Sequence, residues 1–79
     1  MLFRSIEEGV TVERSEIGPN VNLEAGSVVK DSRLQHTIVG AKSTITGSTL
    51  HHSMIGQRVV VSGVKGVASL GDDSEMVGD

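Results

Sequence analysis

The chain has 79 residues, a net charge near −3 and a single aromatic residue, Phe3, and it contains no cysteine, tryptophan or tyrosine. These numbers limit it to one small domain, and they exclude disulfide bonds and thiolate metal sites. No apolar run approaches the roughly 18 residues of a transmembrane helix, and residues 1–8 lack the apolar stretch of a secretory signal. We therefore expect a cytoplasmic protein with no membrane partner. Without a basic patch or stacking aromatics, nucleic acid is not an expected partner either.

Aliphatic residues recur at intervals of five or six from Ile6 onward. From Val29 the intervals are five, five and six, and the block 29–44 is followed by a block 45–60 of the same design. Helical-pair solenoids need roughly 33 to 47 residues per unit, so a sixteen-residue repeat excludes them. It predicts an all-β, single-stranded parallel β-helix, a triangular solenoid with three short sides per coil. The successive rows begin at Ile6, Val12, Ile17, Leu23, Val29, Leu34, Val39, Ile45, Leu50 and Ile55.

Each row also carries one small or β-branched residue shortly before it ends, and we expect this side chain to point inward at a tight corner. These residues are Val10, Ser15, Val21, Ser27, Ser32, Thr37, Ser43, Ser48, Ser53 and Val59. Glycine and asparagine near the corners are expected to supply backbone with positive φ. They are Gly9, Gly18, Asn20, Gly26, Gly40, Gly47 and Gly56.

The whole chain, 1–79, is read as one β-helix domain of about four coils. Residues 1–5 form the lead-in, 6–61 the regular coils, 62–76 a less regular last coil and 77–79 a tail. The three-residue step from Val61 to Val64 breaks the pattern. It is either a truncated row or a bulge, and the sequence leaves the pairing of residues 61–70 open.

The residue before each inward aliphatic should point outward, because side chains alternate along a strand. Two sides of the prism then carry exposed apolar residues: Asn22, Ile38 and Met54 on one, and Val28, Thr44 and Val60 on another. The remaining side is polar, with Glu16, Arg33 and Thr49. Scattered surface aliphatics would explain this pattern, but we favour a self-association face formed by Val28, Ile38, Met54 and Val60.

His36 and His52 occupy equivalent positions on adjacent coils, beside His51. Two stacked imidazoles are weak candidates for a metal site, because metal sites on such scaffolds need three histidines. A solvated histidine column at a corner is the simpler interpretation. The sequence predicts no catalytic residue and no cofactor.

Rows such as Ile17-Gly-Pro-Asn-Val-Asn and Val39-Gly-Ala-Lys-Ser-Thr resemble the hexapeptide repeats of left-handed β-helices. More narrowly, Ser-Arg-Leu-Gln-His-Thr-Ile-Val-Gly (32–40) and Ser-Thr-Leu-His-His-Ser-Met-Ile-Gly (48–56) are similar to the C-terminal domain of long-form sugar-1-phosphate nucleotidylyltransferases, glucose-1-phosphate thymidylyltransferase in particular. The resemblance covers residues 17–76. It implies left-handed coils and a structural, oligomerising role, with three helices packed side by side as the usual homotrimer.

The catalytic domain of that family has no counterpart in these residues, since no Gly-x-Gly-x-x-Gly loop is present. The resemblance thus implies a detached, non-catalytic helix domain. The alternative is an enzyme on the same scaffold acting at a subunit interface, either an acyltransferase or a metal enzyme similar to γ-type carbonic anhydrases.

Overall fold

A computed structural model of the chain describes residues 4–78. These residues form twelve strands and no helix, so this part of the chain has no helix that could cross a membrane. The strands are β1 (Arg4–Ile6), β2 (Thr11–Glu13), β3 (Glu16–Ile17), β4 (Val21–Leu23), β5 (Val28–Lys30), β6 (Arg33–Val39), β7 (Thr44–Thr46), β8 (Thr49–Ile55), β9 (Val60–Ser62), β10 (Lys65–Gly66), β11 (Ser69–Leu70) and β12 (Glu75–Val77).

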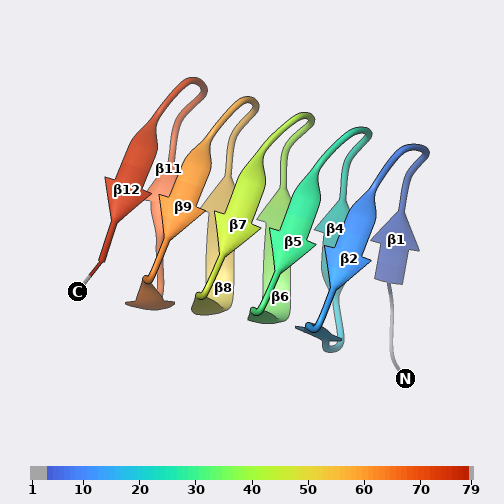
Figure 1. The fold of residues 1–79 in the computed structure, drawn as a ribbon, viewed down its shortest axis with the longest axis horizontal. Helices are drawn as coiled ribbons and strands as arrows, with labels where there is room; N and C mark the ends of the chain where they lie inside the picture. Colours follow the sequence, from blue (N-terminus) through green and yellow to red (C-terminus); the bar gives the residue numbers. More distant parts are fainter. Residues whose placement is uncertain (1–3, 79) are drawn as a thin grey trace.

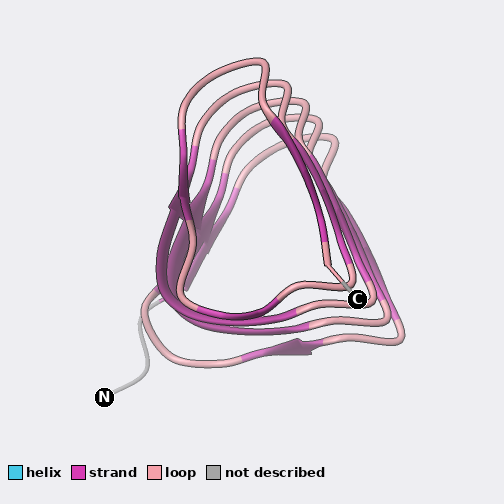
Figure 2. Cartoon of the chain, turned by 90° about the vertical axis from the view of Figure 1, so that its left-hand side faces the viewer, coloured by secondary structure: helices cyan, strands magenta, loops and turns pink. Residues whose placement is uncertain are grey.

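The strands stack in parallel into a three-sided prism (Figure 2). The first side is the five-stranded sheet β12-β9-β7-β5-β2. The other sheet covers two sides, because β6 and β8 each bend at the second corner, where His36 and His52 have positive φ. The second side contains β3, β10 and the first halves of β6 and β8. The third side contains β1, β4, β11 and the second halves of β6 and β8.

The chain runs up the rear strands and down the front strands while it advances from right to left in Figure 1, so the coils are left-handed. This confirms the hand expected from the resemblance, which departs from the right-handed rule for parallel crossovers. The first side has five strands, so there are about five coils rather than four. The coils extend into the expected lead-in and tail, because β1 begins at Arg4 and β12 ends at Val77. Residues 1–3 of the lead-in and Asp79 of the tail lie outside the described residues.

The register confirms the sixteen-residue repeat in the middle coils. Leu34 pairs with Leu50, and Val39 with Ile55. The aliphatic columns face inward and form a narrow core that is shielded from water, and burying each such side chain contributes about 1.5–3 kcal/mol. Its members are Val21, Leu23, Val29, Leu34, Val39, Ile45, Leu50, Ile55, Val59, Val61, Val64 and Ala68.

Eight of the ten small corner residues are buried as expected, whereas Val10 and Ser15 in the first coil are half-buried. Five of the ten also bond one coil to the next through their hydroxyl groups: Ser15, Ser32, Ser43, Ser48 and Ser53. At the first corner, between the first and second sides, Ser15, Ser32 and Ser48 form a column. Ser32 Oγ donates to Lys30 O at 2.7 Å and accepts from the N–H of Ser48 at 3.1 Å. A hydroxyl therefore fits the corner both because it is small and because it satisfies a buried backbone donor.

The expected role of three glycines was wrong. Gly18, Gly40 and Gly56 do not have positive φ; they lie where neighbouring coils come closest. A Cβ on Gly40 would overlap the carbonyl group of Gly56 and lie 2.8 Å from the nitrogen of Gln57. The expectation of positive φ is confirmed at Gly9, Asn20, Gly26 and Gly47. Positive φ also occurs at Arg14, Asp31, His36, Lys42, His52, Arg58, Gly63, Gly66 and Asp73.

The last coil is irregular at a different place from the one expected. Val64 occupies the serine column of the first corner, where its N–H donates to Ser48 Oγ at 3.1 Å. Gly66 then pairs with Leu50, and Ser69 with Met54, so one residue is missing between Gly66 and Ser69. The step from Val61 to Val64 is thus neither a truncated row nor a bulge.

Candidate interface

The third side carries an exposed apolar patch formed by Ile38 and Met54. The two residues pair on adjacent strands, β6 and β8, and are 40% and 60% exposed. Their column continues through Asn22 towards the N-terminus and Ser69 towards the C-terminus. Within this column the apolar residues are therefore confined to the two middle coils and bordered by polar residues.

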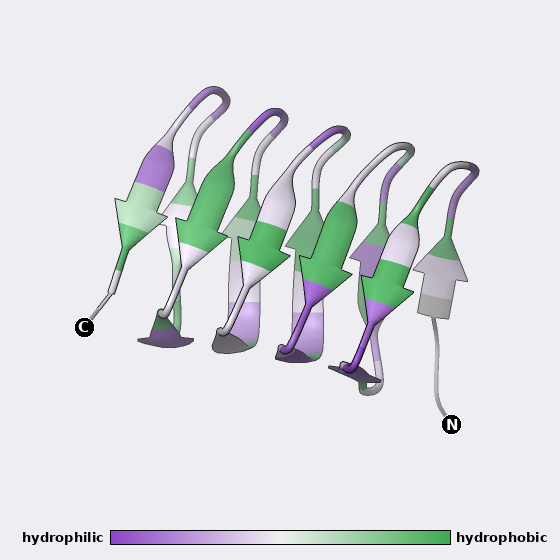
Figure 3. Ribbon diagram, viewed as in Figure 1, coloured by the Kyte–Doolittle hydropathy of each residue, from purple (hydrophilic) through white to green (hydrophobic). Residues whose placement is uncertain are grey.

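The first side carries a second, interrupted stripe. Its outward column runs Thr11, Val28, Thr44, Val60 and Glu75. Val60 is 42% exposed, whereas Val28 is half-buried and is separated from Val60 by Thr44. Figure 3 shows the same alternation, with apolar colour across β5 and β9 and a paler segment at the start of β7. The four residues predicted for the interface thus lie on two faces that meet at the third corner.

A column of polar rings and amides lies at the second corner. Asn20 Nδ2 is 2.9 Å from His36 Nδ1, and the His36 and His52 rings stack with their centroids 4.8 Å apart and an angle of 12° between them. All three residues have positive φ. The stacking distance is the spacing of neighbouring strands, so the coil geometry itself aligns the two imidazoles.

The histidines do not form a convergent metal site. The His51 ring is nearly perpendicular to that of His52, with the centroids 5.7 Å apart. Zinc requires three or four ligand atoms directed at one point, and two parallel stacked rings do not provide this. Among residues 4–78, no group of three or more His, Cys, Asp or Glu side chains is arranged to hold a metal ion.

The polar second side carries a shallow open groove of about 440 Å³. Arg33 and Glu16 lie beside it and face each other at 3.6 Å, with both side chains largely exposed. Gln35, Thr49 and His51 line the rest. His51 is the one histidine that lines this groove among the described residues, so it is the residue that the acyltransferase alternative would use. Glu16, the carboxylate that lines the same groove, pairs with Arg33 at 3.6 Å.

Two arginine–aspartate pairs join the terminal coils to their neighbours, and the sequence reasoning missed both. Arg14 donates to Asp31 at 2.7 and 3.2 Å, and Arg58 donates to Asp73 at 2.6 and 3.0 Å. In each pair the guanidinium lowers the pKa of the carboxyl group, mainly through the hydrogen bond. The signal was present in the sequence, because the partners are seventeen and fifteen residues apart, one coil length each.

Comparison with protein-family models and with curated protein sequences finds no match to the chain.

Proposed function

We propose that the chain is a non-catalytic structural module that holds copies of itself together side by side, as its resemblance to the β-helix domain of sugar-1-phosphate nucleotidylyltransferases implies. The observation that supports this most directly is the pairing of Ile38 and Met54. Each is an outward residue in the middle of a sheet, and together they expose apolar surface where a flat face is available for packing. An apolar patch rimmed by polar residues marks an interaction surface.

The placement of the two stripes favours a closed ring. Ile38 and Met54 lie on the third side and Val60 on the first, and these sides face different directions in the triangular outline (Figure 2). If the third side of one copy packs against the first side of the next, the contact is heterologous, and such contacts form a ring when the rotation between neighbouring copies closes. A homotrimer is the arrangement that the resemblance implies.

Sedimentation velocity of the 79-residue chain tests the proposal. We expect one discrete oligomer that Met54→Lys converts to a smaller species, because the change places a charge in the apolar contact. Thr49→Lys is the matched control, since Thr49 is an outward residue of the same strand on the polar second side. A wild-type monomer at high concentration, or an oligomer that Met54→Lys leaves intact, would contradict side-by-side packing.

A further inference from the structure

One of the two residues that form the apolar patch on the third side is a methionine. The chain has three methionines, Met1, Met54 and Met76, and it has no cysteine. In a protein without thiols, the thioether sulfur of methionine is the group that peroxide oxidises most readily. Met1 lies outside the described residues, so the structure shows the surroundings of Met54 and Met76.

Met54 is the more accessible of these two side chains. It is 60% exposed, against 39% for Met76. It points outward from β8 and pairs with Ile38 on one neighbouring strand and with Ser69 on the other. Because the serine side chain is short, it covers little of the methionine, and solvent reaches the thioether from that direction.

Oxidation of Met54 would change the surface and leave the core as it is. Its neighbours along β8, Ser53 and Ile55, are the inward residues and are buried. The backbone N–H of Met54 donates to Ala68 O at 2.9 Å, and a change in the side chain does not remove this bond. Met76 differs, because it lies in an inward column, where a polar group would be placed at the end of the core.

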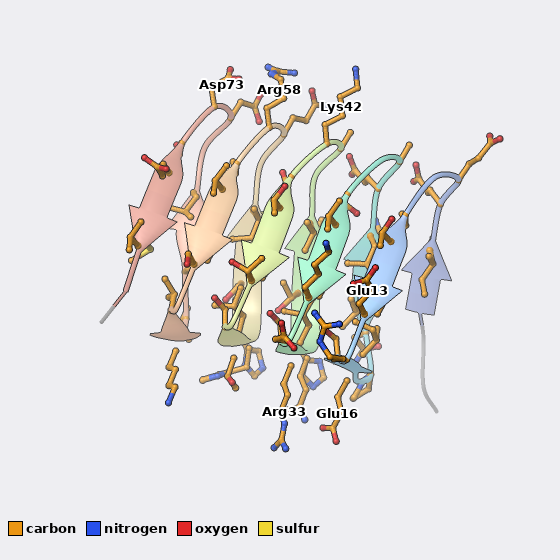
Figure 4. The ribbon with its side chains drawn as sticks, in the orientation of Figure 1. Glu13, Glu16, Arg33, Lys42, Arg58 and Asp73 are labelled. Atoms are coloured by element: carbon orange, nitrogen blue, oxygen red, sulfur yellow. The ribbon has the colours of Figure 1, made fainter. Side chains whose placement is uncertain are left out.

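The outward column that contains Met54 carries no charge. Its members are Ser5, Asn22, Ile38, Met54 and Ser69. The charged side chains labelled in Figure 4 project elsewhere, with Lys42 and Arg58 along the upper edge of the molecule and Arg33 along the lower edge. A polar group at Met54 would therefore have no charged neighbour in its own column to stabilise it inside a contact.

Hydrogen peroxide converts a thioether to a sulfoxide. The sulfur attacks one peroxide oxygen, so an S–O bond forms and the O–O bond breaks. The hydroxide that leaves takes the proton of the transferred oxygen and becomes water; sulfur is oxidised and the peroxide is reduced. The product is polar where the thioether was apolar, and burying a polar group without a hydrogen-bond partner is unfavourable.

We propose that Met54 is a redox switch for side-by-side association, in which the thioether form holds copies together and the sulfoxide form releases them. This inference rests on the proposed function, because it names the regulation of the same contact. Association should in turn protect the sulfur, since the contact covers Met54 and the oxidant reaches it only in free copies. Methionine sulfoxide reductases return a sulfoxide to the thioether, so the switch is reversible.

Hydrogen peroxide treatment followed by sedimentation velocity of the 79-residue chain tests the switch. Peptide mass spectrometry measures the sulfoxide at Met54 and at Met76 in the same samples. We expect oxidation of Met54 to weaken the association constant roughly tenfold, to leave the far-UV circular dichroism unchanged, and to be reversed by a methionine sulfoxide reductase. Oxidation of Met54 relative to Met76 should become slower as the protein concentration rises.

Met54→Leu removes the sulfur and keeps an apolar side chain, so peroxide should leave the association constant of this variant at its untreated value. Met76→Leu is the matched control and should respond to peroxide as the wild type does, because Met54 is still present. A wild-type association constant that survives complete oxidation of Met54 would overturn the proposal. A Met54→Leu variant that dissociates in peroxide would do the same.

The untreated proteins separate the switch from the proposed function. If Met54→Lys dissociates the untreated oligomer and complete oxidation of Met54 does not, the lateral contact stands and the switch is refuted. An untreated wild type that is monomeric at high concentration refutes the lateral contact, and the switch with it.

Discussion

Ser48 Oγ accepts a hydrogen bond from the backbone N–H of Val64 at 3.1 Å, one coil further along the solenoid. The same hydroxyl donates to the carbonyl oxygen of Thr46 at 2.9 Å, so it satisfies groups on two coils at once. Both Ser48 and Val64 are buried. If the Ser48 hydroxyl is removed, water therefore cannot reach the Val64 N–H to take its place without opening the corner.

Ser48→Ala should therefore destabilise the fold. The change leaves the buried N–H of Val64 without an acceptor, which costs about 1–3 kcal/mol. Urea unfolding followed by far-UV circular dichroism measures the difference. Thr49→Ala, one residue further along and exposed, is the control and should change the free energy of unfolding little. Equal effects of the two substitutions would show that the hydroxyl column contributes nothing to stability.

Gly40→Ala should destabilise through a steric clash between coils. The added Cβ would overlap the Gly56 carbonyl group and approach the nitrogen of Gln57 to 2.8 Å. Both are backbone atoms held in the stack, and overpacking of this kind costs about 1–3 kcal/mol. Gly71→Ala is the matched control, since a Cβ there meets nothing within 4 Å. The interpretation of Gly40 as a close-approach glycine is wrong if the two variants unfold at the same urea concentration.

Gly66→Ala should destabilise for a different reason. Space is available around Gly66, but its backbone φ of +119° is one that residues other than glycine rarely adopt. Forcing such a conformation costs on the order of 1–3 kcal/mol. We expect a lower thermal midpoint than for Gly71→Ala, measured on the same instrument. A midpoint equal to that of the wild type would mean that the shortened coil tolerates a side chain at this position.

Arg58→Gln should change how stability depends on pH. Arg58 lowers the pKa of Asp73 in the folded chain, so the pair stabilises the fold above the pKa of the unfolded carboxyl group. That contribution is lost as the pH falls through the lowered folded value. Wild type and variant should therefore differ near neutral pH and converge in acid.

Urea unfolding from neutral to acidic pH measures this difference. Lys42→Gln is the control, because Lys42 holds the same corner position one coil earlier, with φ of 60° against 54° for Arg58. Within the described residues Lys42 forms no ion pair. A difference between Arg58→Gln and wild type that stays constant across the pH range would argue against an ionic contribution.

The middle of the chain was readable from the sequence because its repeat is strict. Aliphatic residues such as Leu34 and Leu50 mark the inward columns, and a one-residue slip would turn every column outward. The small corner residues followed from the same spacing, although their hydrogen bonds did not. The last coil was not readable for two reasons. Val64 occupies a corner rather than the inward position that begins a row, and one residue is missing between Gly66 and Ser69.

The candidate interface was predicted in part for the same reason. Alternation along a strand placed Ile38 and Met54 on the outer surface. It did not show that Val28 is half-buried or that Asn20 and His36 interact. The arginine–aspartate pairs escaped notice because their partners are far apart in sequence and become neighbours only through coil stacking.

The spacing of aliphatic and small residues by itself determined the three-sided solenoid, its core columns and its outward apolar residues. Each of these follows from a periodic pattern along the chain. The tertiary structure alone decided which carboxylate each arginine meets, which glycines lie against the next coil, and where the last coil shortens. These features depend on contacts between residues fifteen to seventeen positions apart. Such contacts exist only once the coils are stacked in register.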